Sequence, residues 1–220
     1  MGELDQQLLK FDFNKNYKKD DYFVSKSNYF AFTLIDSWPR WEGKILNICG
    51  EKYSGKTHLA EIFLNKNKGK LIDLNKSNIG EINKLKFYEN IILENFDNNY
   101  DENLIFSLIN FVDQHNKFLL IISERPFNEF KFSLKDLESR SRNCLIAKIG
   151  HPDDELIRIL LSKSFSDKQI FVDNKLIDFA VKRISRSYGK IFEFIYKIDE
   201  ISLKKKKSID LKIIKEVLKV

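Results

Sequence analysis

The sequence predicts an α/β protein in which a parallel sheet flanked by helices is followed by a small all-helical domain. Short apolar runs alternate with amphipathic segments up to about residue 150, and only helical patterns follow residue 152. The length of 220 residues leaves room for one domain and a small companion. We therefore expect three parts: a flexible N-terminal segment at 1–18, an α/β core at 19–151 and a helical domain at 152–220.

Five apolar runs in the core are predicted to be buried strands. They lie at residues 44–49, 69–74, 90–96, 117–123 and 145–149. Helical spacing predicts helices at 56–65 and 102–115, and Asp101 suits the N-cap of the second. Because the strands alternate with helices, we expect the strands to run parallel, with helices on both faces of the sheet.

Beyond residue 152 the apolar residues repeat with a helical period. The expected helices are 153–165, 175–187, 190–203 and 210–220. Residues 169–172 are the one segment of this part for which a short strand is an alternative. The lysine run 204–207 is interpreted as a solvated loop between two of these helices, with a nucleic-acid contact as the alternative.

Composition narrows the classes of protein to consider. Hydrophobic residues make up 43% and charged residues 32%, which is globular composition and argues against wholesale disorder. A net charge of +6 permits nucleic acid as a partner without requiring it. The sequence shows no signal peptide, no apolar run of roughly 18 residues that could cross a membrane, and no disulfide framework from Cys49 and Cys144. We therefore expect a cytoplasmic protein with no membrane partner.

The strongest motif is GEKYSGKT at residues 50–57, which fits G-x-x-x-x-G-K-[ST] without a mismatch. It lies between an expected strand and an expected helix, the context in which such a loop aims backbone N–H groups at phosphates. Lys56 is expected to reach the β- and γ-phosphates, and Thr57 to offer its hydroxyl to Mg²⁺. The other nucleotide-binding residues expected in the loop are Gly50, Ser54 and Gly55.

A loop of this kind needs an acid at the end of a neighbouring strand to hold Mg²⁺. Glu94 follows the apolar run of residues 91–93 and takes that place. Many ATPases put a second acid next, but Asn95 is a neutral amide that cannot accept a proton. Asp97 is the next carboxylate along the chain. The sequence therefore predicts tight binding of ADP or ATP with Mg²⁺ and weak intrinsic hydrolysis.

Several stretches resemble the ATPase domain of the bacterial replication initiator DnaA, an AAA+ P-loop NTPase. DYFVSKSN at 21–28 resembles the segment that opens that domain, and GKTHLAEIF its P-loop helix. LLIISERP at 119–126 and DLESRSRN at 136–143 are similar to its first sensor strand and its arginine-finger box. The resemblance covers nearly the whole chain from about residue 20, and it implies an AAA+ core followed by a helical lid.

Within that family the chain resembles the Hda type of DnaA-related regulators, because it shows neither flanking domain of a full initiator. This resemblance implies DnaA and the DNA sliding clamp as partners, with DNA contacted only indirectly and a monomer or homodimer left open. Such proteins carry a clamp-binding peptide of the form Gln-x-x-Leu-x-hydrophobic, which fits a preformed pocket. Gln6, Leu9 and Phe11 have this spacing, and Gln7 and Phe13 give a competing frame.

The resemblance also assigns roles to single residues. Val24 would line the adenine pocket, and Ser123, at a strand end, would stand at the first sensor. Arg140 matches the arginine finger, which stabilises transition-state charge at the γ-phosphate of a neighbouring subunit. The second sensor falls on Arg186 or Lys190, between which the sequence does not decide.

Two other functions and a second finger residue are the alternatives to this interpretation. The chain could be a DNA-acting ATPase, such as a helicase loader or truncated initiator, for which the run 204–207 is the only DNA-contact signal in the sequence. A P-loop kinase would need an acceptor site and a phosphate lid within the core, and the sequence offers neither. For the finger, Arg142 is a second candidate, and the structural interpretation is a cap or an ion pair with Asp136 or Glu138.

Overall fold

Five strands form a single parallel sheet in the computed structural model, which describes residues 17–73, 82–97, 99–205 and 209–219. Their order across the sheet is β2-β3-β4-β1-β5, and each neighbouring pair is parallel. The strands are β1 (Ile45–Cys49), β2 (Gly69–Ile72), β3 (Asn90–Phe96), β4 (Phe118–Ser123) and β5 (Leu145–Lys148). The predicted α/β class with a parallel sheet is confirmed.

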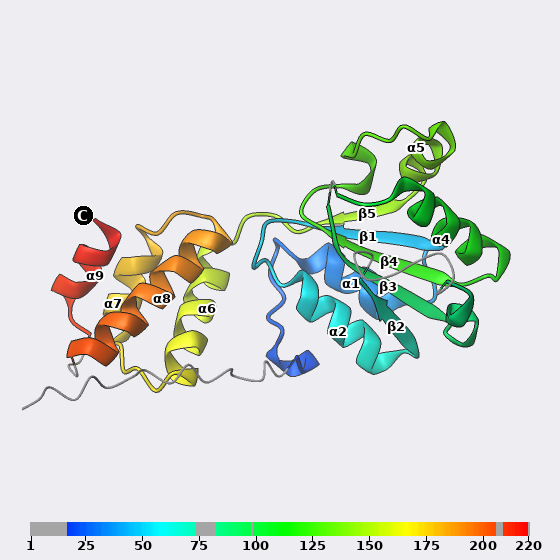
Figure 1. Cartoon of the computed structure of the whole chain (residues 1–220). Helices are drawn as coiled ribbons and strands as arrows, with labels where there is room; N and C mark the ends of the chain where they lie inside the picture. The colour runs from blue at the N-terminus through cyan, green and yellow to red at the C-terminus, as the bar shows by residue number, and fades with distance from the viewer. Residues whose placement is uncertain (1–16, 74–81, 98, 206–208, 220) are drawn as a thin grey trace, which may run out of the picture.

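Helices cover both faces of this sheet, as Figure 1 shows. One face carries α1 (Tyr29–Ser37) and α2 (Lys56–Lys66), and the other carries α4 (Glu102–Gln114) and α5 (Lys135–Arg142). Side chains of a strand alternate between the two faces. In β3, Ile92 packs with the cluster on the α2 side, whereas Ile91 packs with the cluster on the α4 side. Asp101 caps α4 as expected, since its carboxylate accepts a hydrogen bond from Asn103 N at 2.9 Å.

The C-terminal helices form a hydrophobic cluster of their own beside the sheet (Figure 1). They are α6 (Asp154–Asp167), α7 (Asn174–Val181), α8 (Tyr188–Lys205) and α9 (Leu211–Leu218). Asp153, Asp173 and Asp210 cap three of them by accepting hydrogen bonds from backbone N–H groups of the first turn. Within the described ranges, no helix has the length and apolar content needed to cross a bilayer.

One expected helix of this part was too long, and the strand left open at 169–172 is not formed. The helix expected at 175–187 ends at Val181, because the guanidinium of Arg186 donates to the carbonyl oxygens of Val181 and Ile184 at 2.9 Å each. These bonds satisfy carbonyl groups that a longer helix would have used. Residues 169–172 form no strand, since the chain there turns back on the end of α6.

Sequence patterns did not predict α1 and α5. Both are short, at nine and eight residues, and α5 is almost entirely polar. Each is held by a few buried side chains, Ala31 and Ile35 in α1 and Leu137 in α5. Tertiary packing rather than a local apolar period therefore stabilises them.

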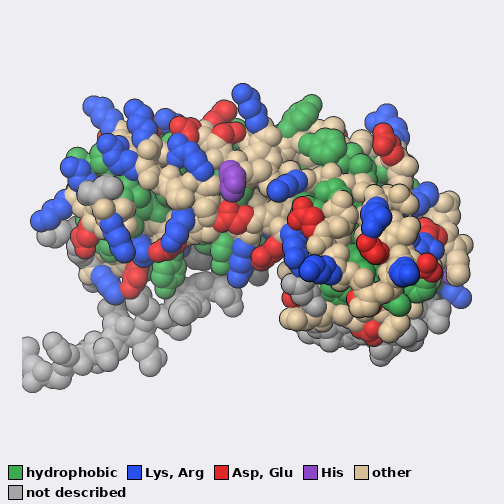
Figure 2. Space-filling model, turned by 90° about the horizontal axis from the view of Figure 1, so that it is seen from above, with side chains coloured by type: hydrophobic (Ala, Val, Ile, Leu, Met, Phe, Trp, Pro, Cys, Tyr) green, Lys and Arg blue, Asp and Glu red, His purple; other side chains and the backbone are tan. Residues whose placement is uncertain are grey.

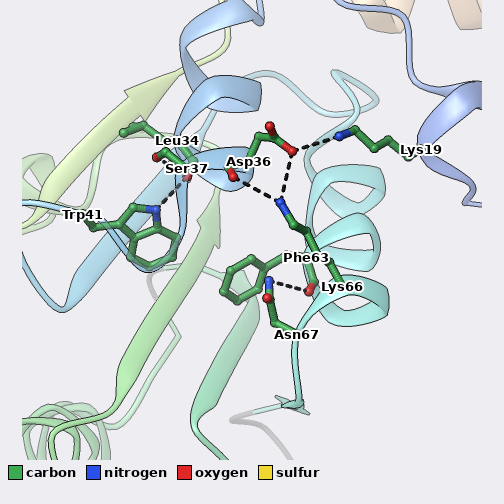
Figure 3. A network of polar contacts seen from close by, with 8 residues as sticks. All are labelled: Lys19, Leu34, Asp36, Ser37, Trp41, Phe63, Lys66 and Asn67. Atoms are coloured by element: carbon green, nitrogen blue, oxygen red, sulfur yellow. Dashed lines mark hydrogen bonds and ion pairs between the residues drawn. The ribbon is translucent and has the colours of Figure 1, made fainter.

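A polar network fastens the segment before α1 to the end of α2 (Figure 3). Asp36 accepts hydrogen bonds from Lys19 Nζ at 2.8 Å and from Lys66 Nζ at 3.2 Å. These hydrogen bonds hold the pKa of Asp36 below its ordinary value. His58, in the first turn of α2, lies 2.8 Å from the carbonyl oxygen of Lys18. The segment is thereby held along the start of α2, where the loop after β1 ends.

Candidate nucleotide site

The predicted phosphate loop connects β1 to α2 at the carboxyl end of the parallel strands. Gly55 has a φ of 91°, in the left-handed region that glycine adopts without strain. A Cβ at this position would also lie only 3.1 Å from the ring of Tyr22. Gly50 N donates to the carbonyl oxygen of Ser123 at 3.3 Å, which ties the loop to the end of β4.

Lys56 lies inside this loop. Its ammonium donates to the carbonyl oxygens of Gly50 and Glu51 at 2.7 and 2.8 Å. Burial lowers the pKa of Lys56, and the charge of Glu124 acts against that shift. A cation that is partly removed from water and surrounded by loop carbonyls is poised to exchange them for phosphate oxygens.

A cavity of about 850 Å³ opens in front of the loop. Four groups of residues line it: Ser54, Gly55, Lys56 and Thr57 of the loop, Asn95 near the end of β3 and Asp97 just beyond it, Ser123, Glu124 and Arg125 at and beyond the end of β4, and Phe192 of α8. Ligands of open parallel sheets bind at this edge, outside the carboxyl ends of the strands. The cavity therefore brings together most of the residues that the phosphate motif and the sensor strand predicted.

Glu94 is the candidate metal ligand next to this wall. Its Oε1 atom is buried and hydrogen-bonds to none of the described residues. A buried acceptor without a partner is costly unless a donor or a cation satisfies it. Glu94 and the hydroxyl of Thr57 therefore fit a role in holding Mg²⁺, whose preferred ligands are oxygens.

Asn95 follows Glu94 at an irregularity in the pairing of β3 with β4. Its φ of 54° lies in the left-handed region, which asparagine tolerates better than most residues. The backbone here thus favours asparagine, while its amide supplies no base to the cavity.

Ser123 is held in place by Asn47, a residue that our sequence analysis did not single out. Asn47 is fully buried in β1, and its Nδ2 donates to Ser123 Oγ at 2.8 Å and to the carbonyl oxygen of Ile121 at 3.0 Å. Its Oδ1 accepts from Phe127 N at 2.9 Å. The hydroxyl of Ser123 donates in turn to the carbonyl oxygen of Arg125 at 2.7 Å. An asparagine inside the apolar run KILNIC was the signal available in the sequence.

Glu51 joins the phosphate loop directly to the helical part. Its carboxylate accepts hydrogen bonds from Ser187 Oγ, from Tyr188 N at 3.2 Å and from Gly189 N at 3.0 Å. The carboxylate therefore caps the N-terminus of α8, where the helix dipole favours negative charge. Burial of the carboxyl raises its pKa, but the hydrogen bonds from Ser187, Gly189 and Tyr188 outweigh burial and leave it below the ordinary value.

Tyr53 makes the second connection between the same two parts. It has a φ of 69°, an uncommon conformation for a residue with a bulky side chain. Its ring stacks on Phe192 of α8 with centroids 4.5 Å apart. We call the Glu51 cap and the Tyr53–Phe192 stack the loop–lid contact. It couples the conformation of the phosphate loop to the position of the C-terminal helices.

Replacing Glu51 by glutamine is expected to weaken this contact. The free energy of unfolding should fall by about 1–2 kcal/mol near neutral pH, since charged hydrogen bonds are lost. Because the folded pKa is depressed, the wild-type contribution is present above the ordinary value of 4.5 and is lost as pH falls through the folded pKa. Urea unfolding at several pH values measures it. Glu61→Gln is the matched control, and equal pH profiles for the two variants would contradict the prediction.

The structure places neither candidate for the second sensor at the cavity wall. Arg186 caps α7 and forms an ion pair with Asp154 at 2.6 Å. Lys190 is exposed and forms an ion pair with Glu193 at 2.8 Å. From α8, it is Phe192 that faces the cavity.

Arg140 lies on α5, away from the cavity wall. Its guanidinium forms an ion pair with Asp113 of α4 and lies 5.8 Å from the ring centroid of Phe106. About a third of the side chain, 35%, stays exposed. Arg142, the second candidate, pairs with Glu138 on its own helix, whereas the partner of Arg140 is neither Asp136 nor Glu138.

Val24 is half-buried in a turn before α1, and it is not part of the cavity wall. Asn28 closes the turn, because its Oδ1 accepts from Ser25 N at 2.8 Å and its Nδ2 donates to the carbonyl oxygen of Phe23 at 2.9 Å. The carbonyl oxygen of Ser27 accepts from Gly150 N at 2.8 Å, next to the start of the helical part. The peptide candidates Gln6, Leu9 and Phe11, like the frame of Gln7 and Phe13, lie outside the described residues.

The fold can be compared with solved structures. It superposes on domain III of the replication initiation protein DnaA from Thermotoga maritima with a TM-score of 0.73 and 19% identity, over 94% of this chain and 97% of that one. The chain has the AAA+ fold of DnaA domain III. The AMPPCP-bound DnaA of Aquifex aeolicus gives a TM-score of 0.70 and 18% identity, over 92% of this chain and 70% of that one.

Sequence comparison agrees with this DnaA-like fold, although no family model matches the chain. The chain is 25% identical to DnaA of Caldanaerobacter subterraneus over 97% of its length and 54% of that protein. An uncharacterized protein of Haemophilus influenzae is also 25% identical, over 78% of this chain and 80% of that one. The chain spans about half the length of the curated DnaA relatives it matches.

Proposed function

We propose that this chain is a DnaA-related regulator of chromosomal replication initiation. It binds ADP or ATP with Mg²⁺, docks on the DNA sliding clamp, and promotes hydrolysis of DnaA-bound ATP through Arg140. The single observation that carries the regulatory role is that Arg140 is partly exposed on α5, away from the wall of its own cavity. This position supports a role at the nucleotide of a neighbouring molecule, as for arginine fingers that act in trans.

Nucleotide binding rests on the phosphate loop. The loop and the N-terminus of α2 line the cavity, and Lys56 is held inside the loop by carbonyl oxygens. The buried, unpaired Oε1 of Glu94 supports a place for Mg²⁺ beside Thr57. When bound, Mg²⁺ would neutralise phosphate charge. With Asn95 in the position of a second acid, hydrolysis by the chain alone is expected to be weak.

The parts of the chain divide the work in this proposal. Residues 1–18 carry the clamp-binding peptide, with Gln6, Leu9 and Phe11 as anchors. Residues 19–151 form the nucleotide-binding core, in which we assign Val24 to the adenine pocket and Ser123 to the first sensor. Residues 152–220 form the lid, and the second sensor remains either Arg186 or Lys190.

The test is ATP hydrolysis by ATP-loaded DnaA, measured with this protein, the sliding clamp and DNA present. We expect hydrolysis to accelerate only in the complete mixture, and to return to the basal rate when the clamp is omitted. An unchanged rate in the complete mixture would overturn the regulatory role. Equilibrium binding of labelled ADP and ATP to the isolated chain tests the nucleotide site separately.

The alternative function is a DNA-acting ATPase. The similarity to the DnaA proteins named above supports this alternative as well. It predicts hydrolysis by the isolated chain that rises when DNA is added. If ATP hydrolysis by the isolated chain is weak and does not change when DNA is added, the regulatory proposal is favoured over this alternative.

A further inference from the structure

Positive charge is unevenly distributed along this chain. Residues 201–220 contain seven lysines and two acidic residues, whereas residues 1–200 contain 31 basic and 30 acidic residues. The excess charge of the molecule therefore resides almost entirely at its C-terminal end. In Figure 2 the side chains of Lys and Arg are dense over the helical part, at the left of the view.

Most basic side chains of α6 and α8 are neutralised within the protein. Ion pairs join Arg158 to Asp178, Lys168 to Asp199, Arg186 to Asp154, both Lys190 and Lys197 to Glu193, and Lys204 to Glu200. A third basic residue of α6, Lys163, pairs with Asp21 of the core. These cations contribute little to the field outside the molecule.

The basic residues of α7 and α9 differ. Lys175 lies in the first turn of α7, and Lys182 and Arg183 lie in the turn directly after its last residue, Val181. On α9, Lys212 and Lys215 lie three residues apart on one side of the helix, and Lys219 follows as its C-cap. All six are exposed, and among the described residues none forms an ion pair with a carboxylate.

The two rows meet at Phe179. The guanidinium of Arg183 lies 3.7 Å from its ring centroid, and Lys215 Nζ lies 6.0 Å from the same centroid. Two cations are thus held within about 10 Å of each other, a separation at which they repel in solution. We call the six residues Lys175, Lys182, Arg183, Lys212, Lys215 and Lys219 the α7–α9 basic face.

We propose that the α7–α9 basic face binds the phosphate backbone of DNA. Each row runs about 10 Å along its helix to the turn just past the helix end, which matches about three phosphate steps of one strand. Two such rows present a repeating cationic surface without a shaped pocket, which suits a repeating polyanion read without sequence preference. This direct contact goes beyond the proposed function, in which DNA enters only through the clamp.

Other polyanionic partners fit this face less well. A bilayer surface would need an apolar side of the helix to insert, but Ile213 and Ile214 of α9 are already buried in the helical cluster. An acidic protein would need apolar anchors at the centre of the interface. Here the central ring, Phe179, is covered by Arg183 and Lys215.

Fluorescence anisotropy of labelled single-stranded and duplex oligonucleotides tests the proposal, with the full chain, between about 50 and 200 mM salt. Three double variants remove two charges each: R183Q/K215Q, K175Q/K212Q and the matched control K168Q/K197Q. The control neutralises lysines that are paired with acids, so it changes net charge equally. Circular dichroism and labelled-nucleotide binding check that each variant is folded.

We expect both basic-face variants to weaken DNA binding by about tenfold and to lower the salt slope by about two, while the control keeps both near wild type. The oligonucleotide that the wild-type chain binds more tightly shows whether single-stranded or duplex DNA is the preferred form. Equal losses in all three variants would mean that only net charge matters and would overturn the proposal. So would absence of DNA binding at the lowest salt, or binding to anionic lipid vesicles but not to DNA.

Discussion

Replacing Lys56 by alanine is expected to weaken binding of ATP and ADP by about 30-fold or more. The ammonium is the cation at the centre of the phosphate loop, and it already donates to the carbonyl oxygens of Gly50 and Glu51. A bound phosphate would receive charge-assisted hydrogen bonds in their place, each worth about 1.5–3 kcal/mol. Equilibrium titration with a fluorescent nucleotide measures the loss.

Lys52→Ala is the matched control for this variant. Lys52 belongs to the same loop and lines the same cavity, but it is exposed and lies 5.4 Å from the ring centroid of Tyr53. Its loss is expected to change affinity by less than about threefold, because an exposed charge is screened. Lys56→Met, which keeps the aliphatic stem, separates loss of charge from loosening of the loop. Equal effects of Lys52→Ala and Lys56→Ala would contradict the assigned role.

Local chemistry made the loop and the strands predictable. A strand, a glycine-rich turn and a helix in consecutive order specify where Gly55 and Lys56 lie, since each element is set by its own residues. The position of Glu94 near the end of β3 and the cap at Asp101 follow from the same short-range rules. Residues of this kind can be assigned from one sequence because their partners lie within a few positions.

Long-range partners were not predictable in this way. Glu51 reaches Gly189, 138 residues away, and no local pattern marks either as a capping pair. Arg186 illustrates the same limit, because its link to Asp154 depends on how α6 meets the end of α7. For the same reason the sequence did not decide between Arg186 and Lys190 as the second sensor. The residue of α8 that reaches the cavity depends on how the C-terminal helices pack, and in the structure this residue is Phe192.

Under the proposed function, replacing Arg140 by alanine is expected to lower the stimulated rate of hydrolysis of DnaA-bound ATP by at least about 100-fold. Arginine fingers supplied in trans contribute factors of about 10³–10⁵. In the free chain the guanidinium pairs with Asp113 and lies near Phe106. Because both partners of the pair are partly exposed, releasing Asp113 costs only about 0–1 kcal/mol. The ion pair therefore orients the arginine without preventing it from reaching a neighbour.

Two further variants separate this catalytic role from a structural one. Asp113→Asn removes the ion pair but leaves the guanidinium, so it is expected to keep the stimulated rate within about threefold of wild type. Arg142→Ala removes the neighbouring guanidinium, which pairs with Glu138 on the same helix, and should also leave the rate near wild type. If Arg140 served only to join α5 to α4, Asp113→Asn would reproduce the loss seen in Arg140→Ala. If both Asp113→Asn and Arg140→Ala kept the wild-type stimulated rate, Arg140 would not be the finger, and another residue would have to supply it.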